Sequence, residues 1–219
     1  MHNKLSESEI NDGWILLFDG KSMNEWHIYN EKSDGTAWKI IDGCIALYPE
    51  VIIDNRTKGG GDLVSNEVYD QFHFKTDWKL DKGGNSGIFF WVQEDKQWEF
   101  TWQTGPEMQL LDNDNHKDGL IEKRKAGDMY DLISSTPGSL KPWGEWNTSE
   151  ILVKNNNVAF LLNGKEILNT IIGDKAWTQR VSDSKFKDYL SFGLKKSGRI
   201  ALQDHRDKVW FRNIKIKKL

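Results

Sequence analysis

The segment DQFHFKTDWKL, residues 70–80, alternates between apolar and polar side chains along its length. Phe72, Phe74 and Trp78 fall on one face, and polar residues such as Lys75 fall on the other. Because successive side chains of a strand point to opposite faces, this period of two indicates a strand with one face in a core and one toward solvent. The segment therefore predicts a long strand of an antiparallel sheet.

Shorter segments with the same period lie on both sides of this strand. We expect strands at residues 14–18, 37–41, 44–48, 85–93, 107–112, 129–133, 149–154, 157–172, 199–204 and 208–216. The turn residues Asp42-Gly43 and Asn163-Gly164 predict hairpins, the second within 157–172. Only residues 6–13 and 174–189 favour short helices, and in the first of these Ser6 and Glu9 have the spacing of a capping box. About a dozen short strands at this spacing predict an all-β sandwich or jelly roll of two antiparallel sheets.

The chain contains no repeat, linker or low-complexity tract that would divide it. Sandwiches of about 200 to 250 residues commonly form one unit. We therefore expect a single domain over residues 1–219, in which residues 1–12 form a short helical lead-in.

The composition excludes several classes of protein. The 219 residues carry 33 acidic and 30 basic side chains, which gives a formal charge of −3, and only 37% are hydrophobic. No apolar run approaches the roughly 18 residues of a membrane span. Phosphate binding needs a concentrated basic face, so this mixed charge argues against a nucleic-acid partner. The single cysteine, Cys44, excludes a disulfide framework and a cysteine-based zinc site.

Tryptophan is unusually frequent, with 11 of the 219 residues. An indole carries a large apolar ring and one polar N–H, so these residues either pack in the core or line a surface that meets a ring-shaped ligand. The composition alone leaves both possibilities open.

The two faces of residues 85–93 differ. Ser86, Ile88, Phe90 and Val92 form a mostly apolar face that fits between two sheets, whereas the other face is mixed and carries Asn85, Gly87, Phe89, Trp91 and Gln93. Aromatic rings stack on sugar C–H groups and amides bind hydroxyls, so the mixed face suits a sugar-binding surface. Alternatively, it is a second buried face beneath a helix or long loop.

Residues 105–112, GPEMQLLD, contain the best acid–base candidates. Glu107 lies in a strand otherwise built of Met and Leu, which favours a position facing a cleft over a surface ion pair. Laminarinase-type glucanases carry carboxylates at i, i+2 and i+5 of a bulged strand, and a bulge here would bring Glu107, Gln109 and Asp112 onto one face. The middle position is an amide, however, so the close carboxylate pair of a double displacement is incomplete.

Two histidines lie beside acidic groups. His116 follows Asp112 in DNDNHKD, an alternation that resembles a cation-binding loop but is more often a solvated turn. His205 follows Gln203 and Asp204 at a strand end, where sandwich loops present reactive groups. Each imidazole is a candidate base, acid or metal ligand.

Residues 141–147, KPWGEWN, combine Lys141 with two indoles, Trp143 and Trp146, and one carboxylate. The segment either contacts substrate as a loop or caps the end of the sandwich.

Seven segments occur in the order of one known family. They are GWILLFDGKSMNEW (13–26), NSGIFF (85–90), GPEMQLLDN (105–113), GDMYDLI (127–133), KPWGEWN (141–147), LNGKE (162–166) and IALQDH with VWFRNIKIK (200–217). From about residue 13 to 219 the chain resembles the bacterial 3-keto-disaccharide hydrolase domain family, common in Bacteroidetes. The resemblance implies a concanavalin A-like lectin/glucanase jelly roll with a few short helices.

The resemblance also implies an activity and a compartment. The substrate would be a small oligosaccharide or glycoside whose carbon 3 is a ketone, and the setting would be periplasmic, secreted or at the cell surface. Residues 1–4 belong to no basic-then-apolar leader, so no signal peptide is expected in this sequence. Either the protein is cytoplasmic or the sequence starts after a removed leader.

The polar cleft positions that the family implies are Asn85, Glu107, Gln109, Asp112, His116, Lys141 and His205. A ketone acidifies the proton on carbon 2, so a base can form an enolate that expels the glycosidic oxygen. We expect His205 or Glu107 as that base. His116 and Asp112 are candidates for proton delivery or for binding a divalent metal, an ion that is possible but not required. Many members of the family have Arg where this chain has Trp91, so any substrate contact that this Arg makes is in doubt here.

The remaining expectations concern ligand contacts and metal ligands. Gln109, Asn85 and Lys141 would hold hydroxyl and keto oxygens, and Gln203, Phe89, Trp91 and Trp143 complete the substrate-binding set. The metal candidates are Glu107, His116 and His205. We also expect Trp91, Trp98, Trp102, Trp143 and Trp146 to border one concave site that holds Glu107.

Two other functions stay open from sequence. One is a non-catalytic carbohydrate-binding module, because this fold also hosts lectins. The other is a retaining β-glucanase. The oligomeric state is not indicated by any motif.

Overall fold

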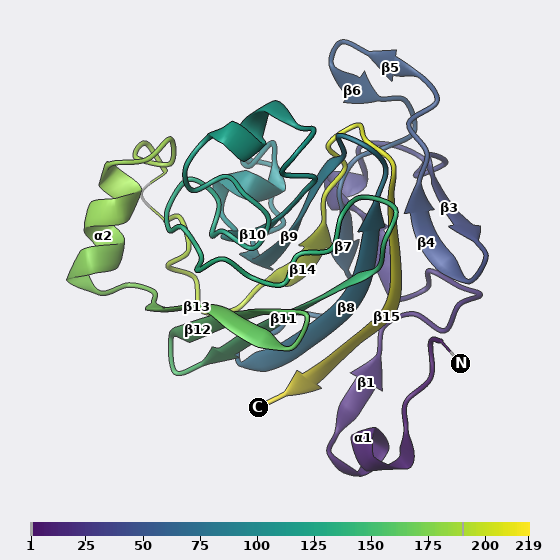
Figure 1. Cartoon of the computed structure of the whole chain (residues 1–219), viewed down its shortest axis with the longest axis horizontal. Coiled ribbons are helices and arrows are strands. Elements are labelled where there is room, and N and C mark those ends of the chain that lie inside the picture. Colours follow the sequence, from purple (N-terminus) through teal and green to yellow (C-terminus); the bar gives the residue numbers. More distant parts are fainter. Residues whose placement is uncertain (1, 190) are drawn as a thin grey trace.

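The computed structural model describes residues 2–189 and 191–219 and places their strands mainly in two facing antiparallel sheets (Figure 1). The larger sheet has the order β13-β12-β11-β8-β15-β4-β3, with β1 also paired to β15. Its strands are β1 (Trp14–Leu16), β3 (Trp38–Ile41), β4 (Cys44–Leu47), β8 (Phe72–Leu80), β11 (Asn147–Lys154), β12 (Asn157–Leu162), β13 (Lys165–Ile171) and β15 (Val209–Lys218). The strand predicted at residues 70–80 is β8, near the middle of this sheet.

The smaller sheet has five strands in the order β10-β9-β14-β7-β2. They are β2 (Trp26–Ile28), β7 (Leu63–Ser65), β9 (Asn85–Val92), β10 (Glu107–Leu111) and β14 (Arg199–Leu202). A separate hairpin of β5 (Ile52–Ile53) and β6 (Arg56–Thr57) projects from the body of the molecule (Figure 1). The prediction of an all-β sandwich with two antiparallel sheets is therefore confirmed.

Helices are few and short, as expected. They are α1 (Glu7–Asn11), α2 (Lys175–Ser182) and the 3-10 turns η1 (Tyr29–Glu31), η2 (Thr101–Gln103) and η3 (Lys117–Leu120). The Ser6 hydroxyl accepts from Glu9 N and the Glu9 carboxylate accepts from Ser6 N, which is the predicted capping box. Within residues 2–189 and 191–219, no helix has the length and apolar character needed to cross a membrane.

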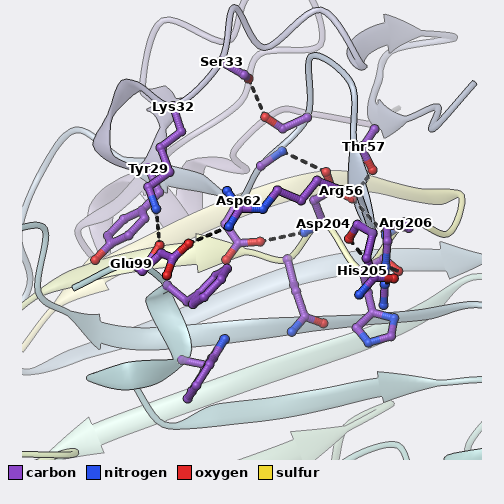
Figure 2. A pocket seen from close by; sticks show the side chains of 16 residues that line it. Tyr29, Lys32, Ser33, Arg56, Thr57, Asp62, Glu99, Asp204, His205 and Arg206 are labelled. Atoms are coloured by element: carbon purple, nitrogen blue, oxygen red, sulfur yellow. Dashed lines mark hydrogen bonds and ion pairs between the residues drawn. The ribbon is translucent and has the colours of Figure 1, made fainter. Parts of the chain in front are cut away.

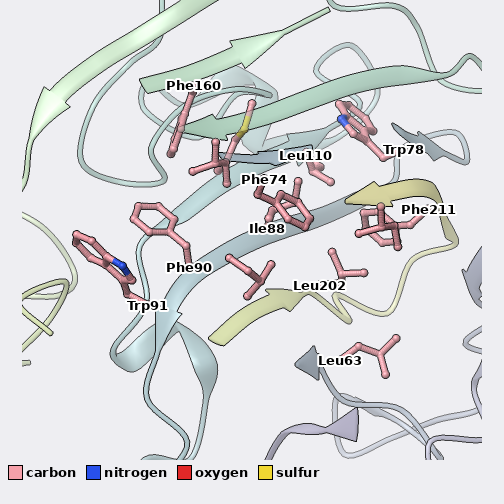
Figure 3. Packing of buried hydrophobic residues seen from close by; sticks show 14 of the residues in the cluster. Leu63, Phe74, Trp78, Ile88, Phe90, Trp91, Leu110, Phe160, Leu202 and Phe211 are labelled. Carbon is pink, nitrogen blue, oxygen red and sulfur yellow. The ribbon is translucent and has the colours of Figure 1, made fainter. Parts of the chain in front are cut away.

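The core lies between the sheets (Figure 3). Phe74 and Trp78 of β8 belong to the same core cluster as Ile88 and Phe90 of β9, and all four side chains are buried. Burying one such apolar side chain stabilises the fold by roughly 1.5–3 kcal/mol. The alternation of β8 therefore fixes which face of the larger sheet turns inward.

The alternation of β9 breaks at Trp91. Its φ is +55°, so Phe90 and Trp91 both enter the core, with ring centroids 5.6 Å apart. The Trp91 indole N–H donates to Asp70 O (2.9 Å), and Gly198 allows close approach because a Cβ there would lie 2.2 Å from the Trp91 carbonyl carbon. The expectation that Trp91 binds substrate is therefore wrong: the irregular backbone turns it inward, and it is 2% exposed.

One expected strand does not form. In the segment 129–133, Met129 makes only isolated bridges, to Met108 and to Ile133, and the chain turns at Asp131 with a φ of +61°. The segment is a tight turn fastened to the edge of β10, because Tyr130 N donates to Glu107 O (3.1 Å).

Candidate active site

A cavity of about 140 Å³ opens on the face of the smaller sheet that points away from the core. Met108 and Leu110 of β10 face the core, so the intervening Gln109 and the preceding Glu107 face the cavity. The residues that line it are Asn85, Trp102, Glu107, Gln109, Tyr130, Lys185, Gln203 and His205. Five of these eight, Asn85, Glu107, Gln109, Gln203 and His205, are predicted site residues.

The strand register explains how distant residues meet here. Because β9 pairs with β10, Gly87 lies opposite Gln109, and because β14 lies on the other side of β9, Gln203 N donates to Gly87 O (2.9 Å). The chain then continues to His205 at the rim of the cavity. Three segments that lie up to 120 positions apart, from Asn85 to His205, thus contribute to one site through ladder pairing.

Glu107 is the single carboxylate among the eight lining residues, and it is 5% exposed. Burial raises the pKa of its carboxyl to about 8, although the Lys185 ammonium partly opposes this shift. Gly87 gives the carboxylate its space, because a Cβ at that position would lie 2.0 Å from Glu107 Oε1. At neutral pH this carboxyl holds a proton, as a general acid must.

Amide groups surround Glu107. With its amide nitrogen turned toward the neighbouring acceptors, Gln109 donates to Ser86 O (3.0 Å) and to Glu107 Oε1 (3.1 Å). The side-chain oxygens of Asn85 and Gln203 are buried and have no hydrogen-bond partner in the described part of the chain. An unsatisfied buried acceptor costs roughly 1–3 kcal/mol, so both oxygens are suited to a ligand that brings hydroxyl donors.

Lys185 is a cavity residue that sequence reasoning missed. It comes from the segment after α2, where Lys185 N donates to Asp131 Oδ2 (3.0 Å), and its ammonium lies 4.0 Å from the centroid of the Tyr130 ring. Although Lys185 as a whole residue is exposed, desolvation of its ammonium beside the Tyr130 and Trp102 rings lowers the pKa of that ammonium, and the charge of Glu107 partly offsets the shift. Tyr130 was also missed, and both residues reach the cavity only through tertiary contacts, whereas Trp102 is one of the indoles expected to border the site.

His116, His205 and Asp207 gather at the rim. One possible ligand atom from each lies within 4.8 Å of the others, and the two imidazole centroids are 6.1 Å apart. His205 Nδ1 lies 3.6 Å from Asp207 Oδ2 and has no hydrogen-bond partner among the described residues. His116 caps η3, because its Nδ1 accepts from Asp118 N (3.1 Å), and burial lowers the pKa of this imidazole.

This trio offers the donor types of a divalent cation site. However, the backbone N–H of Asp118 occupies Nδ1 of His116, so the neutral ring carries its proton on Nε2 and offers no free lone pair. The arrangement does not fit a metal ion without breaking that bond. Glu107 does not belong to this group, so its expected place among the metal ligands is not supported.

A second, larger cavity of about 350 Å³ adjoins the first and shares Trp102, Gln203 and His205 with it (Figure 2). Its walls come from the η1 region, the β5–β6 hairpin, η2 with the residues before it, and residues 203–206. Phe100 and Trp102 stack with ring centroids 5.5 Å apart and planes 14° apart. These two rings form an aromatic surface that begins at the small cavity and continues into the large one.

Hydrogen bonds fix the polar wall of the large cavity. Asp204 accepts from Thr57 Oγ1 (2.8 Å) and Gly61 N (2.8 Å), and Asp204 N donates to Asp62 Oδ1 (2.8 Å). Burial raises the pKa of Asp62 to about 6. Arg56 pairs with Glu99 at 2.5 Å across the mouth. The β5–β6 hairpin is thereby tied to the strand end that carries His205.

Other predicted residues lie elsewhere. Asp112 accepts from Gly83 N (2.8 Å) and Asn115 Nδ2 (2.8 Å), and it lines neither cavity. The predicted bulge is absent, since β10 pairs with β9 in continuous register, so Asp112 does not share the face of Glu107. Asp112 instead is buried at 5% exposure and shapes the turn after β10.

Three predicted ligand contacts are also placed outside the cavities. Phe89 is fully buried with Tyr29 beneath the wall of the large cavity. Lys141 Nζ donates to Trp146 O (3.1 Å), and Trp143 is 46% exposed away from both cavities. Of the five indoles expected at one site, only Trp102 lines the cavity that holds Glu107.

Comparisons with known proteins agree with this architecture. The sequence profile of the 3-keto-alpha-glucoside-1,2-lyase-like domain family matches residues 13–217. A curated 3-keto-disaccharide hydrolase from Bacteroides thetaiotaomicron is 38% identical over 229 residues, which cover 95% of this chain and 79% of the relative.

Two solved structures are also similar. A crystal structure of a candidate glycosyl hydrolase from Parabacteroides distasonis is 34% identical, with a TM-score of 0.90 and 100% of both chains covered. An endo-beta-1,3(4)-glucanase of family GH16 has a TM-score of 0.53 at 10% identity, with 90% of this chain and 88% of the glucanase covered. The second likeness concerns the fold alone and agrees with the expected lectin/glucanase jelly roll.

Proposed function

Because the chain belongs to the 3-keto-alpha-glucoside-1,2-lyase-like domain family, we propose that it is a carbohydrate-active enzyme that cleaves 3-keto-glycosides by β-elimination. The name of the Bacteroides relative supports a 3-keto sugar as substrate. The single observation that carries the proposal is the buried Glu107, whose pKa of about 8 keeps it protonated in a cavity beside a lysine and a histidine. Elimination next to a ketone needs such separate acid, base and cationic groups.

The reaction proceeds in two steps. A base removes the proton on carbon 2, and the electron pair of that C–H bond moves toward the ketone oxygen to form an enolate. The enolate then collapses to a C1=C2 double bond, the bond from carbon 1 to the glycosidic oxygen breaks, and the leaving oxygen takes a proton. Addition of water to the double bond would complete a net hydrolysis.

His205 is the group we assign as base. It lies at the junction of the two cavities, and its unpartnered Nδ1 faces Asp207, whose carboxylate stabilises the imidazolium that forms. The neutral His116 ring beside it limits the orientation of His205 without adding charge. Proton transfer by a positioned side chain typically contributes 10²–10⁴ in rate.

Glu107 and Lys185 stabilise the negative charge that develops on the leaving oxygen and on the enolate oxygen. The protonated Glu107 donates its proton to the leaving oxygen, as its raised pKa permits. The Lys185 ammonium, held over the Tyr130 ring, provides positive charge for the enolate oxygen. The buried oxygens of Asn85 and Gln203 accept from sugar hydroxyls.

The larger cavity accommodates the leaving group. It adjoins the small cavity at Trp102 and His205, so a glycoside whose keto ring lies over Glu107 would extend its second unit along Phe100. Aromatic rings of this kind stack on the C–H faces of sugars.

The decisive experiment mixes the purified chain with a 3-keto-glucoside, the parent glucoside and an unoxidised β-glucan, and follows release of the leaving group. We expect release from the keto compound alone, an unchanged rate in the presence of a chelator, and a loss of 100-fold or more in His205→Ala. Sugar binding without release from any keto-glycoside would contradict the proposal and favour a binding module. Cleavage of the β-glucan would favour a glucanase.

A further inference from the structure

A hollow of about 350 Å³ lies on the outer face of the larger sheet, outside the two cavities of the candidate active site. Phe211 and Trp78 point into the core, so their neighbours Trp210 of β15 and Lys79 of β8 point outward, and these two residues pair across the strands. The hollow is lined by Ile41, Asp42, Cys44, Tyr48, Lys79, Trp146, Trp210 and Arg212. None of these residues has a role in the proposed reaction.

The shape of the hollow follows from side-chain size. On its outer face β4 carries small residues, Cys44 and Ala46, whereas Ile45 and Leu47 between them enter the core. Trp210 stands directly beside Ala46, so a bulky ring borders a low floor. Trp146 and Tyr48 form further aromatic walls, and Tyr48 meets Trp210 edge-on at 5.9 Å.

Two cations lie between the aromatic rings. The Lys79 ammonium is 4.7 Å from the Trp210 ring and 5.2 Å from Trp146, and the Arg212 guanidinium is 3.8 Å from Trp146. Neither side chain donates a hydrogen bond to any residue in 2–189 or 191–219, and Arg212 Nε is buried without a hydrogen-bond partner. A guanidinium that is only 18% exposed and keeps unused donors is suited to an anion.

The surrounding charges leave Lys79 without an acidic partner among the described residues, whereas Arg212 has one. Asp77 forms an ion pair with Arg212, at 3.6 Å between Oδ2 and Nε and without a hydrogen bond, and Asp42 is the one carboxylate that lines the hollow. Lys39 and Lys208 lie over the Tyr48 ring at 5.8 and 5.2 Å, and Glu50 neutralises Lys39 at 2.7 Å. The net charge facing the hollow is therefore positive.

From this combination we infer that the hollow is a second carbohydrate site, which binds a sugar unit carrying a carboxylate or a sulfate. The indoles and Tyr48 supply ring surfaces for sugar C–H groups, and Lys79 and Arg212 bind the acidic group. The site is separated from the Glu107 cavity by the core, so it would hold an acidic glycan without blocking turnover. This inference does not depend on the proposed reaction.

Binding to the chain of residues 1–219 tests the inference, measured by titration calorimetry with three probes. These are a digalacturonate, a chondroitin sulfate disaccharide and neutral cellobiose, with inorganic phosphate as a fourth ligand. We expect saturable binding of at least one acidic disaccharide, weaker binding at high salt, and no detectable binding of cellobiose at the outer site.

Variants locate the binding. Lys79→Gln removes a charge at a partly exposed position and is expected to lower the affinity for the acidic saccharide at least tenfold. Trp146→Ala is expected to lower this affinity by a similar factor. Trp143→Ala and Lys82→Gln are matched controls, because both residues lie outside the hollow, and neither should change the affinity. All variants should retain the wild-type circular dichroism spectrum, and Lys79→Gln should retain wild-type turnover.

Three results would overturn the inference. They are the absence of saturable binding by both acidic disaccharides, unchanged affinity in Lys79→Gln, and loss of binding in Glu107→Gln, which would place the ligand in the other cavity. Equal affinity for phosphate and the disaccharides would reduce the hollow to a simple anion site.

Discussion

At the scale of single residues, the environment of Glu107 determines its chemistry. A carboxyl in water has a pKa near 4.5, whereas burial between Gly87, Gln109 and the Tyr130 turn raises that of Glu107 to about 8. The neighbouring Asp112, five residues further on, shows no comparable role because its oxygens accept from Gly83 and Asn115 in a turn. Two acidic residues of one segment therefore serve different purposes.

Replacing the Glu107 carboxyl by an amide removes the proposed acid while keeping its size. We expect Glu107→Gln to lower kcat for a 3-keto-glycoside by 10²–10⁴, with unchanged sugar binding. The measurement is steady-state release of the leaving group. Glu122→Gln, at an exposed position, is the control and should retain full activity. A rate within threefold of wild type would remove Glu107 from the mechanism.

The pH dependence has a defined sign. Glu107 acts as a proton donor, so kcat/KM should fall about tenfold for each pH unit above about 8, where the carboxyl of the free enzyme loses its proton. A rate that instead rises through pH 8 would identify Glu107 as the base.

The same shift affects stability. A carboxyl whose pKa is raised in the folded state stabilises the fold fully below about pH 4.5, and this contribution is lost as pH rises to about 8. Glu107→Gln should therefore melt at a higher temperature than wild type at pH 9, and the difference should shrink toward pH 5. Equal melting temperatures at pH 9 would show that the carboxylate is not desolvated.

At the scale of elements, pairing of β9 with β10 and β14 builds the site. The strand register places Gly87 opposite Gln109 and next to Gln203. Position 87 has to be a glycine because the Glu107 side chain crosses β9 there and a Cβ would collide with its carboxylate. The irregular backbone at Trp91 then turns that indole into the core. The first residues of β9 therefore line or support the candidate site, whereas Phe90 and Trp91 near its end pack in the core.

Gly87→Ala tests this crossing. The added Cβ would lie 2.0 Å from Glu107 Oε1, so the carboxyl must move, and we expect kcat to fall at least tenfold. Gly13→Ala is the control: with a φ of +83° and no atom within 4 Å of the new Cβ, it should reduce stability modestly and leave kcat unchanged. Wild-type kcat in Gly87→Ala would show that the carboxyl position is not critical.

The segment after α2 contributes one charge to the site. We expect Lys185→Gln to lower kcat by about 10²–10³, since removal of one oxyanion-stabilising group has such an effect, and Lys185→Arg to restore part of it. The exposed Lys187→Gln is the matched control. Equal kcat in Lys185→Gln and Lys187→Gln would assign Lys185 a structural role only.

At the scale of the whole molecule, the sandwich separates two aromatic surfaces. Trp102 and Phe100 lie beside the smaller sheet, whereas Trp146 and Trp210 lie on the outer face of the larger one. Segments from four parts of the chain enclose the cavity that we assign to the leaving group (Figure 2). The length of substrate that the site accepts therefore depends on how these segments pack together.

Phe100→Ala should reveal this dependence. We expect KM for a 3-keto-disaccharide to rise about tenfold, because lost stacking on a sugar ring is worth on the order of 1 kcal/mol or more. The methyl 3-keto-glucoside, which lacks a second ring, serves as the control substrate and should keep its KM within twofold. An equal rise for both substrates would place Phe100 at the keto sugar.

The sequence by itself determined the two-sheet sandwich, the hairpins, the capped α1 and the presence of Glu107, Gln109, Asn85, Gln203 and His205 at one site. Alternation and turn chemistry are local signals, and strands with one apolar face can bury it only by packing one sheet against another. Only the tertiary structure decided the positions of Trp91, Asp112 and Trp146, and the contributions of Lys185 and Tyr130. The single positive φ of Trp91 reverses the alternation of its strand. The proximity of Glu107 and Lys185, which are 78 positions apart, leaves no periodic pattern in the sequence. The physical reason is that patterning reports which face is buried, whereas a cavity depends on how several separate segments pack together.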